Sequence, residues 1–299
     1  MTQATQGIAL RLLSAFLITA MSAAVHQAAK TAPVGEIMFW RSAIALVPIT
    51  GYMALRGAFP AALKTERPRL HVTRGTLGAA SMAMSFLALA HLPVATVQAL
   101  AFLAPVLVLP LASLLLKEPV GPVLSLAVAT GFAGVIFLLW EALALPGQGA
   151  VIGVAAGLGY AGTMAFVRVH TKRMTVTEQP ATIAFYFAVT SALVGLATLP
   201  LGWSGMGGGG APWLILAGLL GGMAHIASNE AVLRAPVSLL APFDFTALLW
   251  AMGFDLILFS QVPGPLGLVG IAAITAAAVA VALLPKAATP PTAALRRRS

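Results

Sequence analysis

The stretch Val94 to Leu116, VATVQALAFLAPVLVLPLASLLL, decides the fold class of this chain. Only Gln98 interrupts it strongly, and an apolar helix of about 20 residues spans a bilayer core. Similar runs recur along the chain, so that 60% of its 299 residues are hydrophobic and only 8% are charged. So few charges cannot cover a water-facing surface. The sequence therefore predicts an all-α integral membrane protein.

Proline, glycine and charge divide the chain into ten apolar segments. Prolines such as Pro33 and Pro265 stand at the boundaries, because the N–H groups of a first helical turn have no helical partner. The first run is longer than the core of a signal peptide, so it counts as a helix. Helices are expected at about 8–29, 34–55, 72–90, 94–116, 121–139, 150–168, 181–200, 212–232, 237–259 and 265–284.

The basic residues predict the orientation. With the N-terminus in the cytoplasm, 15 of the 17 Lys and Arg fall on the cytoplasmic side. The other two are Lys30, which falls outside, and Arg41, which falls within a helix. Both termini are therefore expected in the cytoplasm, with the protein in a bacterial-type inner (plasma) membrane. The net charge of +9 is accordingly a topology signal and not one for nucleic acid. The basic tail, 285–299, is expected to be disordered.

Ten helices divide into two halves of five, 8–140 and 148–284. Gly121-Pro122 and Gly264-Pro265 each open the last helix of a half. Because five is odd, the halves point in opposite directions through the membrane. A 5+5 inverted repeat of this kind places a binding site near the midplane, where the halves meet.

Several chemistries are excluded by the residues themselves. The chain has no cysteine, which removes disulfides and thiolate metal sites. It has no G-x-x-x-x-G-K-[ST] loop for a nucleotide and no H-E-x-x-H for zinc, so neither a cofactor nor a metal is expected. A membrane enzyme acting on a lipid carrier would need clustered catalytic groups at one interface. A channel would need a ring of like groups, and both stay open as alternatives to a transporter.

Two carboxylates in the ninth segment are the sharpest candidates. Asp244 and Asp255 are about three helical turns, roughly 16 Å, apart on one face. Carboxylates inside a bilayer are costly and point to function. We expect Asp255 to pair with Arg41, which should lie at the same depth. The role of Asp244, in proton transfer or in binding a substrate amino group, stays open.

The eighth segment presents small and polar residues on one broad face: Gly218, Gly221, Gly222, His225, Ser228 and Asn229. This face either lines a cavity or permits close helix packing, and the sequence leaves both open. Glu230 and Arg234 have the favourable i, i+4 order for a helix-end ion pair. Lys117-Glu118 is expected to be structural, or part of an inner gate.

The predicted substrate site combines hydrogen-bonding groups and ring faces from several segments. This lining suits a small amphipathic molecule better than an inorganic ion. Packing against a neighbouring helix is the alternative for each residue alone. The predicted members are Ser81, Ser85, Gln98, Tyr160, Tyr186, His225, Asn229, Asp244 and Trp250.

Three motifs resemble the EamA family of the drug/metabolite transporter superfamily. They are Leu103-Ala104-Pro105 with Leu114 to Pro119, Phe39-Trp40-Arg41, and Phe243 to Trp250 with Gln261-Val262-Pro263 downstream. The family usually has a glutamate where Gln261 stands, so that acidic position is not available here. Among its branches, the aromatic amino acid exporters of the YddG type look nearest.

The resemblance implies ten helices in a 5+5 inverted repeat, alternating access and no ATP hydrolysis. The expected function is secondary-active export of small amphipathic metabolites, above all amino acids, through a central cavity. The expected partners are this small molecule and the lipid bilayer. A transporter of another metabolite or drug in the same superfamily stays open, as does the oligomeric state, a monomer being one option.

Overall fold

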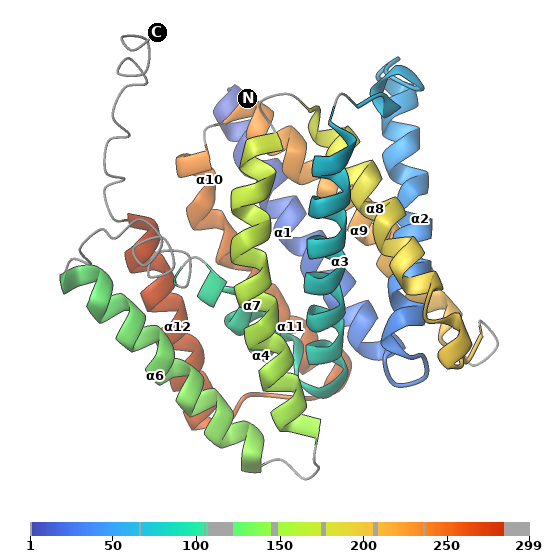
Figure 1. Cartoon of the computed structure of the whole chain (residues 1–299). Coiled ribbons are helices and arrows are strands. Elements are labelled where there is room, and N and C mark those ends of the chain that lie inside the picture. Colours follow the sequence, from blue (N-terminus) through green and yellow to red (C-terminus); the bar gives the residue numbers. More distant parts are fainter. Residues whose placement is uncertain are drawn as a thin grey trace, which may run out of the picture.

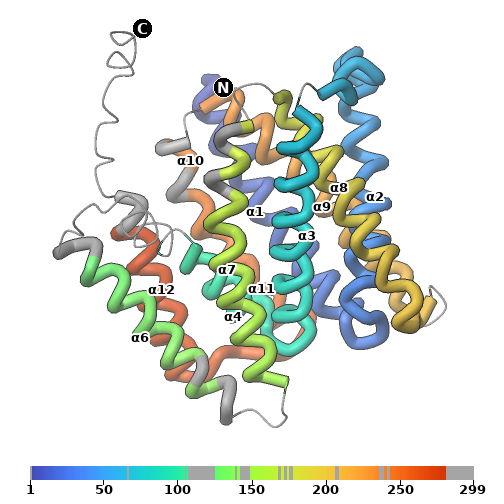
Figure 2. Tube along the Cα trace, in the orientation of Figure 1, coloured from blue at the N-terminus to red at the C-terminus, as the bar shows by residue number. Residues whose placement is uncertain are grey.

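The computed structural model describes residues 2–65, 67–104, 106, 122–144, 149–174, 178–205, 209–235 and 237–283 (Figure 2). Within these residues the regular structure is entirely helical. The helices are α1 (Gln3–Ala28), α2 (Val34–Leu55), η1 (Ala61–Leu63), α3 (Pro68–His91), α4 (Val94–Ala101), α6 (Pro122–Ala144), α7 (Gly149–Met174), α8 (Pro180–Leu196), η2 (Leu199–Leu201), α9 (Ala211–Arg234), α10 (Val237–Asp244), α11 (Thr246–Phe259) and α12 (Pro265–Leu283).

The ten expected segments are all represented in this order. Helix α4 opens the fourth, most of whose remainder lies outside the described residues. The ninth is interrupted at Phe245, so that α10 and α11 together fill the expected range 237–259. Within the described part of the chain, five helices are long and apolar enough to cross a bilayer: α1, α2, α7, α8 and α9. The prediction of a ten-helix, all-α membrane protein is therefore confirmed.

The packing of the helices shows the repeat. Helix α1 packs along α9, and helix α3 packs along α7. In the repeat α1 corresponds to α7 and α3 corresponds to α9, so the two packed pairs are equivalent. The pair α2 and α9 corresponds in the same way to α8 and α3. Helices α2 and α8 pack on each other, as do α6 and α12, which form one side of the bundle (Figure 1). Each half therefore completes the core of the other.

Helices α3 and α9 carry the repeat in their glycines. Gly75 and Gly78 are the eighth and eleventh residues of α3, and Gly218 and Gly221 occupy the same steps of α9. These glycines face corresponding neighbours, since those of α3 contact α8 and those of α9 contact α2. The lack of a Cβ lets the neighbouring helices approach closely.

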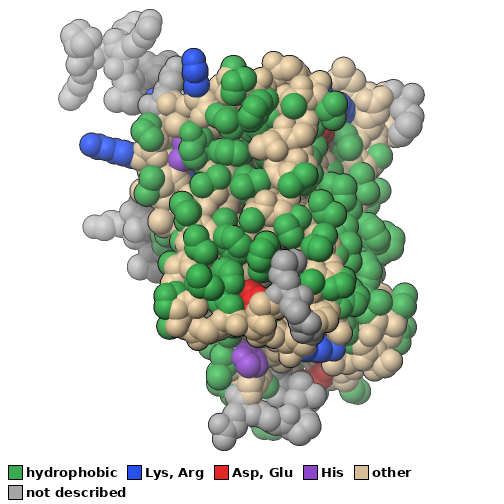
Figure 3. Space-filling view, turned by 90° about the vertical axis from the view of Figure 1, so that its right-hand side faces the viewer, with side chains coloured by type: hydrophobic (Ala, Val, Ile, Leu, Met, Phe, Trp, Pro, Cys, Tyr) green, Lys and Arg blue, Asp and Glu red, His purple; other side chains and the backbone are tan. Residues whose placement is uncertain are grey.

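The outer surface is apolar over large areas (Figure 3). Leu126 and Ile136 of α6 are 68% and 61% exposed, and Ile257 of α11 is 77% exposed. In water such side chains would form an unfavourable surface, whereas lipid tails solvate them. The exposed apolar side chains and the buried polar ones together fit a bilayer environment.

Two carboxylates tie the halves together at helix starts, and one of them corrects a prediction. Asp255 of α11 accepts hydrogen bonds from the N–H groups of Val94 and Ala95 at 3.0 and 2.7 Å, at the start of α4. No ion pair joins it to Arg41 within the described chain, so the predicted pairing is wrong. The first N–H groups of a helix lack helical partners and carry partial positive charge, which gives Asp255 a nearer and better oriented partner.

The second carboxylate belongs to the first half and binds a helix start in the second half. Glu141, in the last turns of α6 in the first half of the fold, accepts from the N–H of Gly264 at 2.8 Å and from the N–H of Gly267. These groups belong to the start of α12 in the second half. Each half therefore supplies an acidic side chain to a helix N-terminus of the other half.

Candidate functional site

A cavity of about 340 Å³ lies within the bundle, between helices of both halves. This volume falls in the range of small-molecule pockets. Helices α1 and α4 line it from the first half, and α7, α9, α10 and α11 line it from the second. Its lining residues are Arg11, Ser14, Ala15, Ile18, Gln98, Phe102, Met164, Ala224, His225, Ser228, Asp244 and Ala247.

One wall of the cavity is held by a bidentate ion pair. Nη2 of Arg11 donates to Oδ2 of Asp244 at 2.6 Å, and Nε contacts Oδ1. Nη1 of the same guanidinium donates to Oγ of Ser228 at 2.7 Å. The pair leaves Asp244 neutralised at the cavity, although its side chain remains 35% exposed. Sequence reasoning treated Arg11 only as a topology signal, because nothing local links it to a residue so far along the chain.

Two side chains of the cavity keep free hydrogen-bonding groups. His225 makes no hydrogen bond to any described residue, and its ring centroid lies 6.0 Å from that of Phe187. Gln98 likewise has no hydrogen-bond partner in the described part of the chain. Phe102 and Phe245 stack with centroids 5.0 Å apart beside them. The cavity thus offers an imidazole, a carboxamide and ring faces to a ligand.

Three of the nine predicted site residues therefore meet at this cavity: Gln98, His225 and Asp244. The other six lie apart from its lining. Asn229 lies beside Tyr52 and Glu230 in another pocket. Trp250 is 43% exposed and packs edge-on against Phe16, with the two ring centroids 5.1 Å apart.

The remaining predicted residues stand on three other helices. Ser81 is 1% exposed, and its hydroxyl has no partner within the described chain, while Ser85 is half-buried on the same face of α3. Tyr160 is half-buried in α7. Tyr186 donates to the backbone oxygen of Leu63 at 2.8 Å. Helical spacing correctly placed these residues on inward faces but could not assign their depth along the helix. Glu118, the predicted gate residue, lies outside the described residues.

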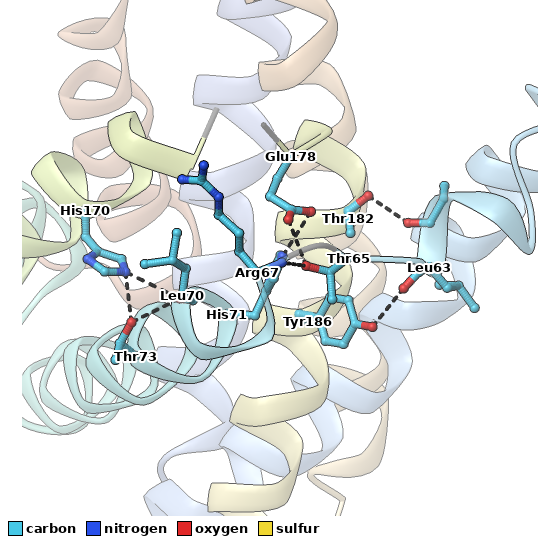
Figure 4. Close-up of polar contacts among 11 residues, drawn as sticks. Leu63, Thr65, Arg67, Leu70, His71, Thr73, His170, Glu178, Thr182 and Tyr186 are labelled. Carbon is cyan, nitrogen blue, oxygen red and sulfur yellow. Dashed lines mark hydrogen bonds and ion pairs between the residues drawn. The ribbon is translucent and has the colours of Figure 1, made fainter. Parts of the chain in front are cut away.

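Tyr186 belongs to a polar cluster at the end of the molecule that carries η1 (Figure 4). Oε1 of Glu178 accepts from Oγ1 of Thr65 at 2.8 Å, and Oε2 lies 3.2 Å from Nε2 of His71, an ion-pair distance. The ring of Tyr186 stacks 4.5 Å from that of His71. Thr182 donates to the backbone of Ala62 at 2.7 Å. This cluster holds the η1 connection against the start of α8.

The acid of this cluster has a shifted pKa. Desolvation, the largest single effect, raises the pKa of Glu178, but the hydrogen bonds from Thr65 and His71 and the charge of His71 lower it by more in total. The pKa of Glu178 is therefore held below its ordinary value. This contact was not predicted, because Glu178 and His71 are distant in the chain and no local spacing relates them.

A second ionic cluster stands at the same end. Glu230 pairs with Arg234 as the i, i+4 spacing predicted. It also accepts from the hydroxyl of Tyr52 and lies 2.9 Å from Nη2 of Arg56. This cluster joins the last turns of α2 and α9. Together the two clusters close the η1 end of the bundle above the cavity.

Comparison with known proteins agrees with this architecture. Residues 5–140 match the EamA-like transporter family. The pseudopaline exporter of Pseudomonas aeruginosa is 27% identical over 280 residues, which cover 92% of this chain and 95% of that protein. The riboflavin transporter of Rhizobium johnstonii is 29% identical over 221 residues, which cover 71% of this chain and 68% of that protein. Neither relative is an aromatic amino acid exporter, so the expected nearness to that branch gains no support.

A solved crystal structure shares the fold. It has a TM-score of 0.62 and 20% sequence identity, and the match covers 92% of this chain and 98% of the other. These likenesses and the helical architecture support one assignment. The chain is similar to multi-pass membrane transporters along most of its length, and its first half resembles the EamA-like transporter family.

Proposed function

We propose that this protein exports a small amphipathic metabolite of the amino acid type by alternating access. The observation that carries the proposal is the cavity of about 340 Å³ between helices of both halves. A volume of this size encloses an amino acid and leaves little room for water beside it. Export is the direction named for the Pseudomonas aeruginosa relative.

The lining suits a molecule that has both polar and apolar parts. His225 and Gln98 supply hydrogen-bonding groups without an intramolecular partner in the described chain, and Phe102 and Met164 supply apolar surface. The two halves, 8–140 and 148–284, would rock around this cavity and open it to each side in turn. The ionic clusters at the η1 end would have to separate when that side opens.

Counterflow in liposomes that hold the purified protein tests this function. The labelled substrates would be phenylalanine, glutamate and histidine, with riboflavin as the compound named for the second relative. Exchange of at least one amino acid above protein-free liposomes is expected. His225→Ala and Gln98→Ala should each weaken apparent affinity about ten- to a hundred-fold through loss of one binding contact worth roughly 1–3 kcal/mol.

Thr76→Ala is a matched control. Thr76 is exposed on α3, away from the cavity lining, and its hydroxyl bonds only backbone oxygens of its own helix in the described structure. This variant should transport as the unmodified protein does. Exchange of riboflavin without exchange of any amino acid would replace the amino acid proposal with that of another metabolite.

A further inference from the structure

Arg41 of α2 is a buried cation without an anionic partner. Its side chain is 3% exposed, and the described residues place no carboxylate within ion-pair distance. Nε and Nη2 contact only the sulfur of Met21, each at 3.4 Å. A thioether is a weak acceptor. A charged group this deep in a membrane protein is costly unless it serves a function.

Arg74 of α3 is a second such cation. Nε donates to Oγ1 of Thr171 at 2.7 Å, and the guanidinium carbon lies 4.6 Å from the centre of the Phe187 ring. Nη1 is buried and has no hydrogen-bond partner in the described part of the chain. The aromatic face compensates part of the charge, but no described carboxylate does.

Both guanidinium groups lie near the same histidine. Arg74 stacks on Phe187, whose ring lies next to that of His225. Arg41 lies against α9 at Gly221, where an added Cβ would be 2.8 Å from Nη2. Gly221 is four residues before His225 and therefore lies one helical turn away on the same face. Both cations thus lie close to His225, although neither belongs to the cavity lining itself.

The described acids near this region form no ion pair with either arginine, although the buried Oε1 of Glu36 has no partner among the described residues. Asp244 is paired with Arg11, and Asp255 binds the start of α4. Glu36, in the first turn of α2, accepts from the backbone N–H of Ser204 at 2.8 Å. A further donor stands on α3, because Ser81 lies seven residues after Arg74 on the same face and its buried hydroxyl has no described partner.

We propose that Arg41 and Arg74, with the hydroxyl of Ser81, form a binding site for the carboxylate of the transported molecule. This inference rests on the proposed function and narrows it to organic acids, amino acids included. A guanidinium presents paired N–H donors that match the two oxygens of a carboxylate. A carboxylate between the two arginines neutralises charge that the described residues leave uncompensated, and the rest of the molecule extends past His225 into the cavity.

Binding to the purified protein in lipid nanodiscs tests the site without transport. The probes are benzoate and succinate, each compared with its uncharged amide, and binding is measured by calorimetry or by the shift in thermal unfolding. The unmodified protein should bind at least one acid and prefer it to its amide. Arg41→Gln and Arg74→Gln should each weaken binding of the acid tenfold or more and abolish that preference.

Arg69→Gln is the matched control, because Arg69 is exposed near the start of the same helix as Arg74. It should bind the acid as the unmodified protein does. Should a glutamine variant fail to fold, Arg41→Lys and Arg74→Lys keep the charge but lose the paired donors, and they should weaken binding several-fold. Equal binding of acid and amide, equal binding by the arginine variants, or no binding of either acid would overturn the proposal.

The two proposals fail in different ways. If acids bind in an arginine-dependent manner but no amino acid exchanges in liposomes, the carboxylate site stands and the amino acid assignment falls. If amino acids exchange and the arginine variants exchange them with unchanged affinity, the transport function stands and the carboxylate site falls.

Discussion

Arg11 and Asp244 are joined by two parallel contacts, one of them a 2.6 Å hydrogen bond from Nη2 to Oδ2. This ion pair links α1 in the first half of the fold to α10 in the second, and it forms a wall of the central cavity. The rocking of the halves proposed above would strain or break this contact. The stability of the pair therefore bears directly on that proposal.

Removing either partner of this pair should destabilise the protein. Asp244→Asn or Arg11→Gln leaves one charge without its partner in a partly buried wall, which should cost about 1–3 kcal/mol. The double variant should lose less than the sum of the two, because the pair acts as one unit. Thermal unfolding in detergent of the four proteins measures this coupling. Strict additivity would show that the two residues do not interact.

Asp255→Ala should destabilise the protein because α4 loses the acceptor for two N–H groups at its start. The expected loss is about 1–2 kcal/mol of unfolding free energy, the range for removal of a helix cap. Glu141→Ala should have a similar effect through the start of α12. Thermal unfolding gives both values.

Exchange of Arg41 and Asp255 provides the control. Because Asp255 binds backbone rather than Arg41, the Arg41→Asp, Asp255→Arg double variant should be at least as unstable as Asp255→Ala. Recovery of stability in this double variant would restore the ion pair that the sequence suggested.

The acid of the η1 cluster predicts a pH dependence. The pKa of Glu178 is lower in the folded protein than in the unfolded chain, so ionised Glu178 stabilises the fold. This contribution is complete above the ordinary glutamate pKa of about 4.3 and is lost as the pH falls through the lowered folded value. The difference in unfolding free energy between the unmodified protein and Glu178→Gln should therefore shrink below about pH 4.3. A difference that stays constant from pH 7 to pH 3 would contradict the role of Glu178.

The fold was predictable because the bilayer imposes a strong pattern. The lengths of the apolar runs and the distribution of charge predicted all ten segments. The division into two halves of five was predicted from the number of segments. The break at Phe245 was missed, although Pro242 and Asp244 interrupt the apolar run beside it. Lengths and faces of helices follow from the sequence, whereas the depth at which a kinked helix presents a side chain depends on its neighbours.

The site was predictable only in part for the same reason. His225, Gln98 and Asp244 line one cavity, as expected of polar groups in apolar helices, which face inward. The partners of charged residues were not found, since Arg11 and Asp244 are joined across the two halves and no local spacing encodes that contact. The pairing of Arg41 with Asp255 was predicted from their depth alone. The N–H groups at the start of α4, which lack helical partners, bind Asp255 instead.

The orientation in the membrane remains to be tested, and the absence of cysteine makes the test direct. Ala61 in η1 and Ser204 after η2 are exposed and lie in connections at opposite ends of α2 and α8. The basic residues predict that η1 faces the cytoplasm. A membrane-impermeant thiol reagent added to whole cells should therefore label Ser204→Cys and leave Ala61→Cys unlabelled until the cells are opened. Labelling of Ala61→Cys alone in whole cells would show that the orientation is the opposite one. The ionic clusters of Glu178 and Glu230 would then lie at the outer end of the protein and not at its cytoplasmic end.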